Sequence, residues 1–526
     1  MKNPIFLLSL IAFLFTFNSC DSTKKTIKTP TTDIPAMEDV DDGIIEVVFL
    51  QMNDVYEIAP LEGGKVGGLA RVATVREQLL KENPLVVTIL AGDFLNPSLI
   101  GTLKHEGERI KGKHIVETMN AMKVDLVTVG NHEFDLKEDE LQARINESKF
   151  EWVVANVLQK DSIGNLSPFA KTINGTSYDF PETYQLNLTD EDGTNVSIGI
   201  LSVCLDSNKK PYVHYNDVFD SAIQAYGEMK DETDYVVGLT HLNIEDDLEL
   251  AKKLPKLPLI MGGHDHHHMY HEVGEVKVAK ADANAKTVYV HRLTFNKKMG
   301  SIKVNSELVE INDKIAEDPI VDAVVDKWNG IAEKSMKDAG FDPEKTITTL
   351  KEPLDGREKV MRNGPTNMGE VITKSILKAA PKSVAAFMNS GSVRLDDFLS
   401  GSITEVDIIR TLPFGGGIVE ADMSGELLHE ILVVGRENKG SGGYLQLQKI
   451  EYVEAEDIWK IDGKTLNPTA TYRIAFTDFL LTGLEKDLDF LTRDNPDIFK
   501  IYEPKKGDKE DLRSDIRRAI IDYLVK

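Results

Sequence analysis

Residues 130–135 read GNHEFD and directly follow the β-rich run DLVTV at residues 125–129. Other predicted strands also end in side chains that can ligate a metal. These ends read ND at 53–54, GD at 92–93, TH at 240–241 and GGHDH at 262–266. In open α/β sheets, ligands bind outside the carboxyl ends of the strands. Strand ends that repeatedly present Asp, Asn or His therefore predict one shared site.

The runs that carry these ends alternate with amphipathic stretches. Strands are predicted at 45–52, 85–91, 125–129, 152–155, 196–203, 235–239 and 257–261, with two more β-like runs at 276–279 and 287–293. Helices are predicted at 69–80, 115–122 and 136–148. Strands that alternate with helices at this spacing indicate a layered α/β domain.

The length and charge of the chain limit what it does. A chain of 526 residues is too long for one compact core. We therefore expect a first domain at 44–311, a connecting helix and hinge at 312–341, and a second α/β domain at 342–526. The 61 basic and 86 acidic residues give a net charge of −25, which disfavours nucleic-acid polymers as partners. The two cysteines exclude a disulfide framework and a cysteine-rich zinc site.

The N-terminus reads as a targeting segment. Residues 1–19 hold one lysine and then a short apolar run, which is typical of a secretory signal peptide. Ser19 followed by Cys20 resembles a relaxed bacterial lipoprotein box, so Cys20 would carry the lipid; the alternative is an ordinary signal peptide with an incidental cysteine. Residues 20–43 are expected to form a flexible tether. These features predict an extracytoplasmic, membrane-anchored lipoprotein on the periplasmic face or the cell surface.

The donor types at the predicted site indicate which metals fit. Oxygen donors mixed with imidazoles suit zinc, manganese or iron better than a soft thiolate metal. Taken singly, each residue has a simpler explanation, since an Asp or Asn after a strand is usually a turn former or helix cap. The joint occurrence of the blocks in order favours the metal site.

In combination, the blocks resemble those of the calcineurin-like two-metal phosphoesterases. More narrowly, they resemble the 5′-nucleotidase family, which includes UDP-sugar hydrolases and cyclic-nucleotide phosphodiesterases. The resemblance continues through LDGRE at 354–358, TNMG at 366–369, NSGSVR at 389–394, LPFG at 412–415 and YRIA at 472–475. It implies an N-terminal four-layer αββα metallophosphoesterase domain and a C-terminal α/β nucleotide-binding domain.

The resemblance also implies roles for individual residues. Two divalent metal ions would be held by Asp54, Asp93, Asn131, His241, His264 and His266, with Asp93 shared between them. His132 would assist catalysis on the phosphoryl group, with Asp135 orienting its ring. The nucleotide would be bound by Arg362, Asn389, Arg394, Phe414 and Phe479, the two phenylalanines stacking on the base, with Arg357 as a weaker addition.

Two positions depart from the family pattern. The family's first block is normally Asp-x-His, whereas this chain has Tyr56 in place of the histidine. Either the phenolate changes the metal preference towards ferric iron, or Tyr56 only packs while water or His105, His114 or His268 fills the position, or the first metal site is weak or empty. After Phe479 the family's acidic ribose loop is replaced by a sequence containing Glu485, which leaves the ribose contact open.

These features predict metal-dependent hydrolysis of phosphate esters of extracytoplasmic nucleotides, above all of nucleoside 5′-monophosphates to nucleoside and phosphate. The alternatives are hydrolysis of UDP-sugars or cyclic nucleotides, cleavage of a sulfur ester on a carrier protein, and a catalytically weakened nucleotide-binding lipoprotein. The expected partners are a small-molecule nucleotide and, through Cys20, a membrane. No protein partner is inferred.

Overall fold

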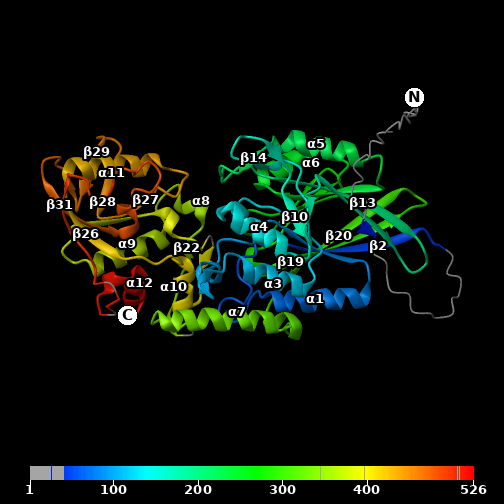
Figure 1. The fold of residues 1–526 in the computed structure, drawn as a ribbon, viewed down its shortest axis with the longest axis horizontal. Coiled ribbons are helices and arrows are strands. Elements are labelled where there is room, and N and C mark those ends of the chain that lie inside the picture. The colour runs from blue at the N-terminus through cyan, green and yellow to red at the C-terminus, as the bar shows by residue number, and fades with distance from the viewer. Residues whose placement is uncertain are drawn as a thin grey trace, which may run out of the picture.

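The computed structural model describes residues 41–525, apart from residues 344, 396, 506 and 509, together with a two-residue strand, β1 (Lys25–Thr26). The predicted signal peptide and Cys20 lie outside the described residues. Within the described part of the chain, no helix is both long enough and apolar enough to cross a bilayer. The chain forms two lobes that lie side by side (Figure 1).

The first lobe contains two β-sheets. The six-stranded sheet has the order β20 (Ser301–Glu310), β19 (Thr287–Asn296), β2 (Ile44–Met52), β3 (Val86–Ala91), β6 (Leu126–Thr128) and β7 (Glu151–Trp152). The seven-stranded sheet has the order β1, β12 (Thr183–Thr189), β13 (Asn195–Cys204), β15 (Tyr235–His241), β16 (Leu259–Gly262), β18 (Val276–Lys280) and β17 (Met269–Val273). Buried apolar side chains of both sheets, such as Phe49 and Val237, form one core between them.

Helices cover the outer faces of both sheets. The six-stranded sheet packs on α1 (Leu69–Glu82), α3 (Lys113–Met122) and α4 (Glu138–Glu147), and α7 (Pro319–Asp338) packs on α1 and α3. The seven-stranded sheet packs on α5 (Val218–Met229) and α6 (Ile244–Lys253). This arrangement confirms the predicted four-layer αββα fold. Shorter elements join the layers: α2 (Leu99–Thr102), β4 (Lys104–His105), β5 (Glu108–Arg109), β8 (Val157–Lys160), β9 (Leu166–Ser167), β10 (Ala170–Ile173), β11 (Thr176–Asp179) and β14 (Val213–Tyr215).

The parallel strands bring the predicted site residues to one edge. In one sheet β2, β3 and β6 run parallel, and in the other β13, β15, β16 and β18 do so. Strand β3 is buried along its whole length, as expected for a central parallel strand covered on both faces. Because parallel strands end on the same side, the turns after them meet at one rim.

The second lobe is built on a five-stranded sheet with helices on both faces. The strand order is β27 (Leu445–Gln448), β23 (Ala385–Asn389), β31 (Thr471–Thr477), β26 (Ile418–Ser424) and β32 (Ile498–Tyr502). Helices α9 (Asn367–Ala379) and α12 (Ile516–Leu524) pack on one core, and α11 (Gly425–Glu437) packs on another. Shorter elements are β21 (Thr346–Thr349), β22 (Leu354–Asp355), α8 (Glu358–Met361), β24 (Phe398–Leu399), β25 (Ser402–Thr404), α10 (Glu405–Thr411), β28 (Ile450–Val453), β29 (Ile458–Ile461) and β30 (Lys464–Thr465).

Helix α7 corresponds to the long helix expected before the second lobe. It begins at Pro319, because Asp318 caps it: the Asp318 carboxylate accepts hydrogen bonds from the backbone amides of Ile320 and Val321, each 3.0 Å long. Trp328 is buried against the first lobe, and its indole nitrogen donates to the Glu117 carboxylate at 3.0 Å. The helix is therefore packed on the first lobe along much of its length.

Candidate active site

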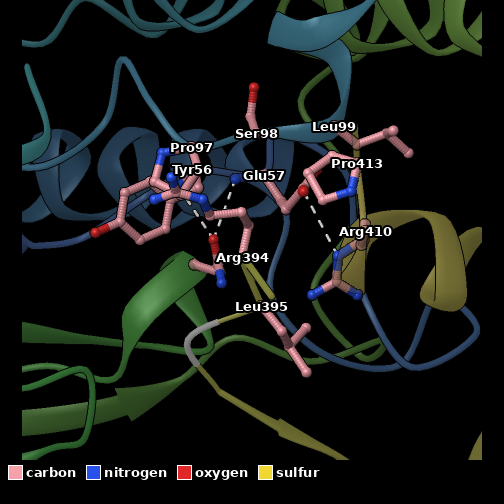
Figure 2. A pocket seen from close by; sticks show the side chains of 10 residues that line it. Tyr56, Glu57, Pro97, Ser98, Leu99, Arg394, Leu395, Arg410 and Pro413 are labelled. Atoms are coloured by element: carbon pink, nitrogen blue, oxygen red, sulfur yellow. Dashed lines mark hydrogen bonds and ion pairs between the residues drawn. The ribbon is translucent and has the colours of Figure 1, made fainter. Parts of the chain in front are cut away.

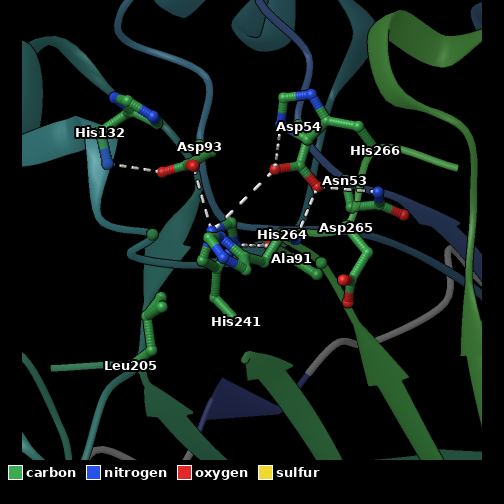
Figure 3. Close-up of polar contacts among 12 residues, drawn as sticks. Asn53, Asp54, Ala91, Asp93, His132, Leu205, His241, His264, Asp265 and His266 are labelled. Atoms are coloured by element: carbon green, nitrogen blue, oxygen red, sulfur yellow. Dashed lines mark hydrogen bonds and ion pairs between the residues drawn. The ribbon is translucent and has the colours of Figure 1, made fainter. Parts of the chain in front are cut away.

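Carboxylates and imidazoles from separate turns meet at the rim of the first lobe (Figure 3). Asp93 Oδ2 lies 3.1 Å from His241 Nε2, and Asp54 Oδ1 lies 3.3 Å from His266 Nε2. His241 Nε2 is 4.0 Å from Asp54 Oδ1, so the two pairs form one cluster. Ligand atoms of Asp93, His241 and His264 all lie within 4.8 Å of one another. Three of the four residues expected around one metal therefore converge in space.

The backbone at these turns is held in an unusual conformation. Four of the predicted ligands have positive φ angles: Asp54 at 53°, Asp93 at 58°, His264 at 82° and His266 at 61°. Such values are uncommon for residues other than glycine and persist where the surroundings impose them, often at functional sites. Gly130 shows how tightly the turns pack, since a Cβ there would lie 2.2 Å from Asp93 Oδ1.

Polar atoms left without a hydrogen bond mark where a metal would fit. Among the described residues, Asn131 Oδ1, Asp54 Oδ1 and His241 Nε2 are buried and make no hydrogen bond of regular geometry, although the latter two lie within ion-pair distance of His266 and Asp93. Buried polar atoms in native proteins are almost always satisfied, so a group of orphans needs a partner. An oxygen and nitrogen donor set of this kind fits a divalent cation.

Hydrogen bonds orient the ligand atoms toward the centre of the cluster. His241 Nδ1 donates to the backbone carbonyl of Ala91 at 2.7 Å, which leaves Nε2 facing the carboxylates. Asp54 Oδ2 accepts from the backbone amide of His264 at 2.8 Å, which leaves Oδ1 free to face inward. Burial opposes the charge on Asp54, but the imidazoles of His266 and His241 together outweigh burial and hold the pKa of Asp54 below its usual value.

His132 and Asp135 form a pair beside the cluster. They lie at the two ends of a short 3₁₀ helix (His132–Asp135), and His132 Nδ1 donates to Asp135 Oδ2 at 2.8 Å. The backbone amide of His132 donates to Asp93 Oδ1 at 2.7 Å. Burial opposes charge on the His132 ring, but the carboxylates of Asp135 and Asp93 outweigh it and raise the pKa of His132 to about 10. The expected reach of Asp135 to the imidazole is confirmed.

Some supporting residues were missed from sequence. Glu133 is fully buried, and its carboxylate accepts hydrogen bonds from the backbone amides of Gly130 at 2.6 Å and Asp93 at 2.9 Å. It thereby ties the loop after β3 to the loop after β6. Asn208 donates to Asp135 Oδ1 at 3.0 Å. The position of Glu133 inside the GNHEFD block could have indicated its role. The sequence around Asn208 contains no comparable motif.

Tyr56 lies inside the cluster. Its side chain is only 5% exposed, and its hydroxyl lies 3.2 Å from both Asp93 Oδ2 and His266 Nε2. The three histidines considered as replacements are engaged elsewhere: His105 and His114 pack on Trp328, and His268 pairs with Asp282. These contacts do not support a histidine at the position of Tyr56, and the hypothesis stays a prediction.

A cleft of about 530 Å³ separates this cluster from the second lobe. Asp93, His132 and His264 line one side, and residues around α8, including Arg357 and Arg362, line the other. Arg362, directly after α8, is ion-paired with Glu358 at the start of that helix. Arg394 lines a smaller neighbouring pocket together with Tyr56 and Pro413 (Figure 2). Cationic groups of the second lobe thus face the cluster of the first.

The remaining predicted nucleotide residues lie on neighbouring loops of the second lobe. Asn389 ends β23 and donates to Glu485 Oε2 at 2.5 Å. Phe414 is 56% exposed and lies 5.8 Å from the Arg394 guanidinium, measured to the ring centre. Phe479 is 39% exposed. The loops that carry the two phenylalanines are joined by a hydrogen bond of 2.9 Å from the Asp478 amide to the Gly417 carbonyl.

Ion pairs connect the two lobes. Glu57, the residue after Tyr56, lies 3.5 Å from Arg410 Nε on α10, measured from its carboxylate oxygen (Figure 2). Lys286 of the first lobe pairs with Asp397 of the second. Both pairs are largely buried. The first pair joins the loop that carries Asp54 and Tyr56 to α10, the helix that precedes Phe414.

Comparisons with known proteins agree with this architecture. Residues 47–268 match the calcineurin-like phosphoesterase family, and residues 346–492 match the 5′-nucleotidase C-terminal domain. Human 5′-nucleotidase is 25% identical over 464 residues, covering 78% of this chain and 76% of the human protein. The silent protein UshA(0) of Salmonella typhimurium is 26% identical over 519 residues, covering 86% of this chain and 88% of its own.

A solved structure shows the same fold across both lobes. The 5′-nucleotidase precursor from Thermus thermophilus aligns with a TM-score of 0.65 at 22% identity, covering 91% of this chain and 96% of that chain. The order of the two matched domains along this chain agrees with the two lobes. The chain is therefore a metal-dependent phosphoric ester hydrolase of the 5′-nucleotidase family, with a calcineurin-like phosphoesterase domain followed by a 5′-nucleotidase C-terminal domain.

Proposed function

We propose that this protein hydrolyses phosphate esters of extracytoplasmic nucleotides, with nucleoside 5′-monophosphates as the main substrates and nucleoside and phosphate as products. One observation carries the proposal: the cleft of about 530 Å³ has the carboxylate and imidazole cluster on one wall and arginines on the other. A nucleotide fits such a site, because cationic groups bind its phosphate and aromatic side chains stack on its base.

Two groups of residues would hold the metals. Asp93, Asn131, His241 and His264 would bind one ion, and Asp54, Asp93 and His266 would bind the other. When bound, a pair of divalent ions polarises the phosphoryl group and lowers the pKa of an attacking water. The orphaned Asp54 Oδ1, Asn131 Oδ1 and His241 Nε2 support this assignment.

His132 would act on the phosphoryl group directly. Its Nδ1 is held by Asp135, so Nε2 is the nitrogen available to donate a hydrogen bond to a phosphoryl oxygen or to the leaving oxygen. Asp135 favours the charged form of the ring and fixes its orientation, which makes that donation stronger. Asn208, by donating to Asp135, would keep the pair aligned.

The second lobe would bind the rest of the nucleotide. Arg362 and Arg394 would contact phosphate or ribose oxygens, and Asn389 together with Glu485 would meet the sugar, because Glu485 is hydrogen-bonded to Asn389. Phe414 and Phe479, on joined loops and still exposed, would stack on the base.

We further propose that Tyr56 takes part in the metal site rather than only packing beside it. Its hydroxyl lies as close to Asp93 as to His266, within the group that would hold the Asp54-side ion. A tyrosine oxygen is a harder donor than imidazole and favours harder, more highly charged ions. Metal analysis of the purified protein and of Tyr56→His tests this: the wild type should retain more iron relative to zinc than the variant. Equal ratios would contradict the proposal.

The location of the protein is also a proposal. The apolar run before Cys20 and the Ser19–Cys20 junction support lipid attachment at Cys20 after removal of residues 1–19. Mass spectrometry of the mature N-terminus should find the lipid on Cys20. Membrane fractionation should find the Cys20→Ala protein released from membranes. A Cys20→Ala protein that stays in the membrane fraction would contradict lipid anchoring.

The central experiment measures phosphate release from a substrate panel in the presence of Mn²⁺, Zn²⁺ or Fe²⁺. The panel holds nucleoside monophosphates, a UDP-sugar and a cyclic nucleotide, and release from a monophosphate above the other substrates is expected. Faster hydrolysis of the UDP-sugar would favour the alternative substrate class. The observation that supports this alternative is that Arg357 lines the cleft in addition to Arg362, so a second phosphate could also be bound. Nucleotide binding without release in every metal would instead support a weakened nucleotide-binding lipoprotein.

A further inference from the structure

We propose that the buried ammonium of Lys280 holds the turns carrying His241, His264 and His266 in the arrangement that binds metal. Lys280 is thus a positioning residue for the metal centre. The inference rests on the metal site proposed above, and it concerns a residue outside every motif that identified that site.

The sheet places Lys280 beside these turns. Lys280 is the last residue of β18, paired with Gly262 at the end of β16, and Gly262 is in turn paired with Thr240 near the end of β15. Three adjacent parallel strands therefore end together, and the lysine side chain extends across their ends. Gly262 provides the room, because a Cβ there would lie 3.0 Å from Lys280 Cε and 2.9 Å from Asp247 Oδ2.

The ammonium of Lys280 binds a group next to each histidine. Its Nζ donates to the carbonyl of Leu242 at 2.6 Å, directly after His241. It also donates to the carbonyl of Gly263 at 2.8 Å, directly before His264. Its third contact is Asp265 Oδ2 at 2.7 Å. Asp265 stands between His264 and His266 in the chain, so one cation fixes both turns.

A second carboxylate, that of Asp247, also forms an ion pair with Lys280. Asp247 Oδ2 lies 2.8 Å from Lys280 Nζ, and Asp247 Oδ1 accepts from the Thr240 hydroxyl at 2.6 Å. Thr240 precedes His241, so the network closes on the same turn. Lys280 and Asp247 are both completely buried. Burial opposes the charge, but Asp247 and Asp265 outweigh it and raise the pKa of Lys280 above its usual value.

A buried ion pair with no link to the metal would affect only folding stability. A positioning role would also affect metal binding, because replacing a residue that orients metal ligands typically weakens metal affinity by about 10- to 100-fold. Metal affinity in a folded variant therefore separates the two roles.

The test compares Lys280→Met with the wild type and with Lys171→Met. Lys171 is a matched control, because it is a buried lysine of the same lobe whose ammonium donates to the Phe150 carbonyl at 3.1 Å. Binding of Mn²⁺ alone to the chelator-stripped proteins is followed by calorimetry, and folding by circular dichroism and thermal melting. We expect Lys280→Met to bind Mn²⁺ about 10- to 100-fold more weakly, and Lys171→Met to bind it as the wild type does.

A second readout and a second variant keep the test decisive. Saturating Mn²⁺ should restore most of the kcat of Lys280→Met, because the ligands themselves are intact. Where Lys280→Met does not fold, the double variant Lys280→Met/Asp247→Asn removes one unpaired buried carboxylate and is measured in its place. A folded variant with wild-type Mn²⁺ affinity would overturn the proposal, as would an equal loss in Lys171→Met. A wild-type protein that binds none of Mn²⁺, Zn²⁺ or Fe²⁺ would overturn the metal site itself.

Discussion

The wall of the cleft that we propose to bind metal and the wall that we propose to bind nucleotide are built in opposite ways. On the first lobe four of the six candidate ligands are buried and four have positive φ, and backbone hydrogen bonds orient His241 and Asp54. On the second lobe Phe414 and Phe479 are exposed, and Arg362 is ion-paired with Glu358, four residues earlier in the chain. The chemistry thus sits in a preorganised centre, whereas recognition uses side chains that can still adjust to a ligand.

Replacing the shared carboxylate should have the largest effect. Asp93→Asn removes a negative charge from the middle of the cluster, so both metals should be lost. Because metal ions supply several kcal/mol of transition-state stabilisation, activity should fall by about 10³-fold or more. Metal content and phosphate release are measured together, with Asp282→Asn as the control, since Asp282 pairs with His268 away from the cluster. Retained metal in Asp93→Asn would show that Asp93 is not shared.

Replacing His132 should damage turnover but not metal binding. His132→Gln removes the imidazole that Asp135 orients, so kcat should fall by about 10²-fold or more. Metal content should stay at the wild-type level. His268→Gln serves as the control for loss of a nearby exposed histidine. A His132→Gln enzyme with unchanged kcat would remove His132 from the catalytic role.

Replacing either aromatic residue of the second lobe should weaken substrate binding alone. Phe414→Ala and Phe479→Ala each lose a stacking contact of about 0.5–1.5 kcal/mol, so KM should rise by roughly 2- to 10-fold at unchanged kcat. Phe499→Ala is the matched control, because Phe499 is an exposed phenylalanine of the same lobe on β32. An equal rise in KM for Phe499→Ala would contradict a specific base contact.

The ion pair between the lobes should have the smallest effect. Glu57→Gln keeps an oxygen that can accept from Arg410, and Arg410 keeps its ion pair with Asp407, so the loss should be about 1 kcal/mol and KM or kcat should change by at most about fivefold. Small-angle scattering would report any change in how the lobes are arranged. The control is Glu249→Gln on the surface of α6. A larger loss for Glu57→Gln would show that this contact governs assembly of the cleft.

Sequence reasoning was strongest where polar residues follow apolar strands. The strands that lead to Asp54, Asp93 and His241 were predicted because their buried side chains give an almost continuous β-rich run in the sequence. The predicted cluster residues converge for the same reason. The division of the first lobe into two sheets came from family resemblance, because periodicity does not reveal which strands share a sheet.

Other elements left no comparable signal. Strand β20 alternates exposed and half-buried residues at the edge of its sheet, so it carries no apolar run. Lys280 looks like an ordinary strand-end lysine until the neighbouring strand ends are placed around it. The inward position of the Tyr56 hydroxyl was also open in sequence, since a tyrosine at that position also fits a purely packing role.

Helix α7 gives the molecule a mechanical property. Its body is fastened to the first lobe through Trp328, while Phe341, just past its end, lies under the guanidinium groups of Arg517 and Arg518 from the second lobe. Its buried side chains from Val321 to Met336 pack on the first lobe, so this helix of about 30 Å extends the first lobe as far as the Phe341 contact. The helix thus moves as part of the first lobe, and a change in the angle between the lobes would have to occur after its last turn.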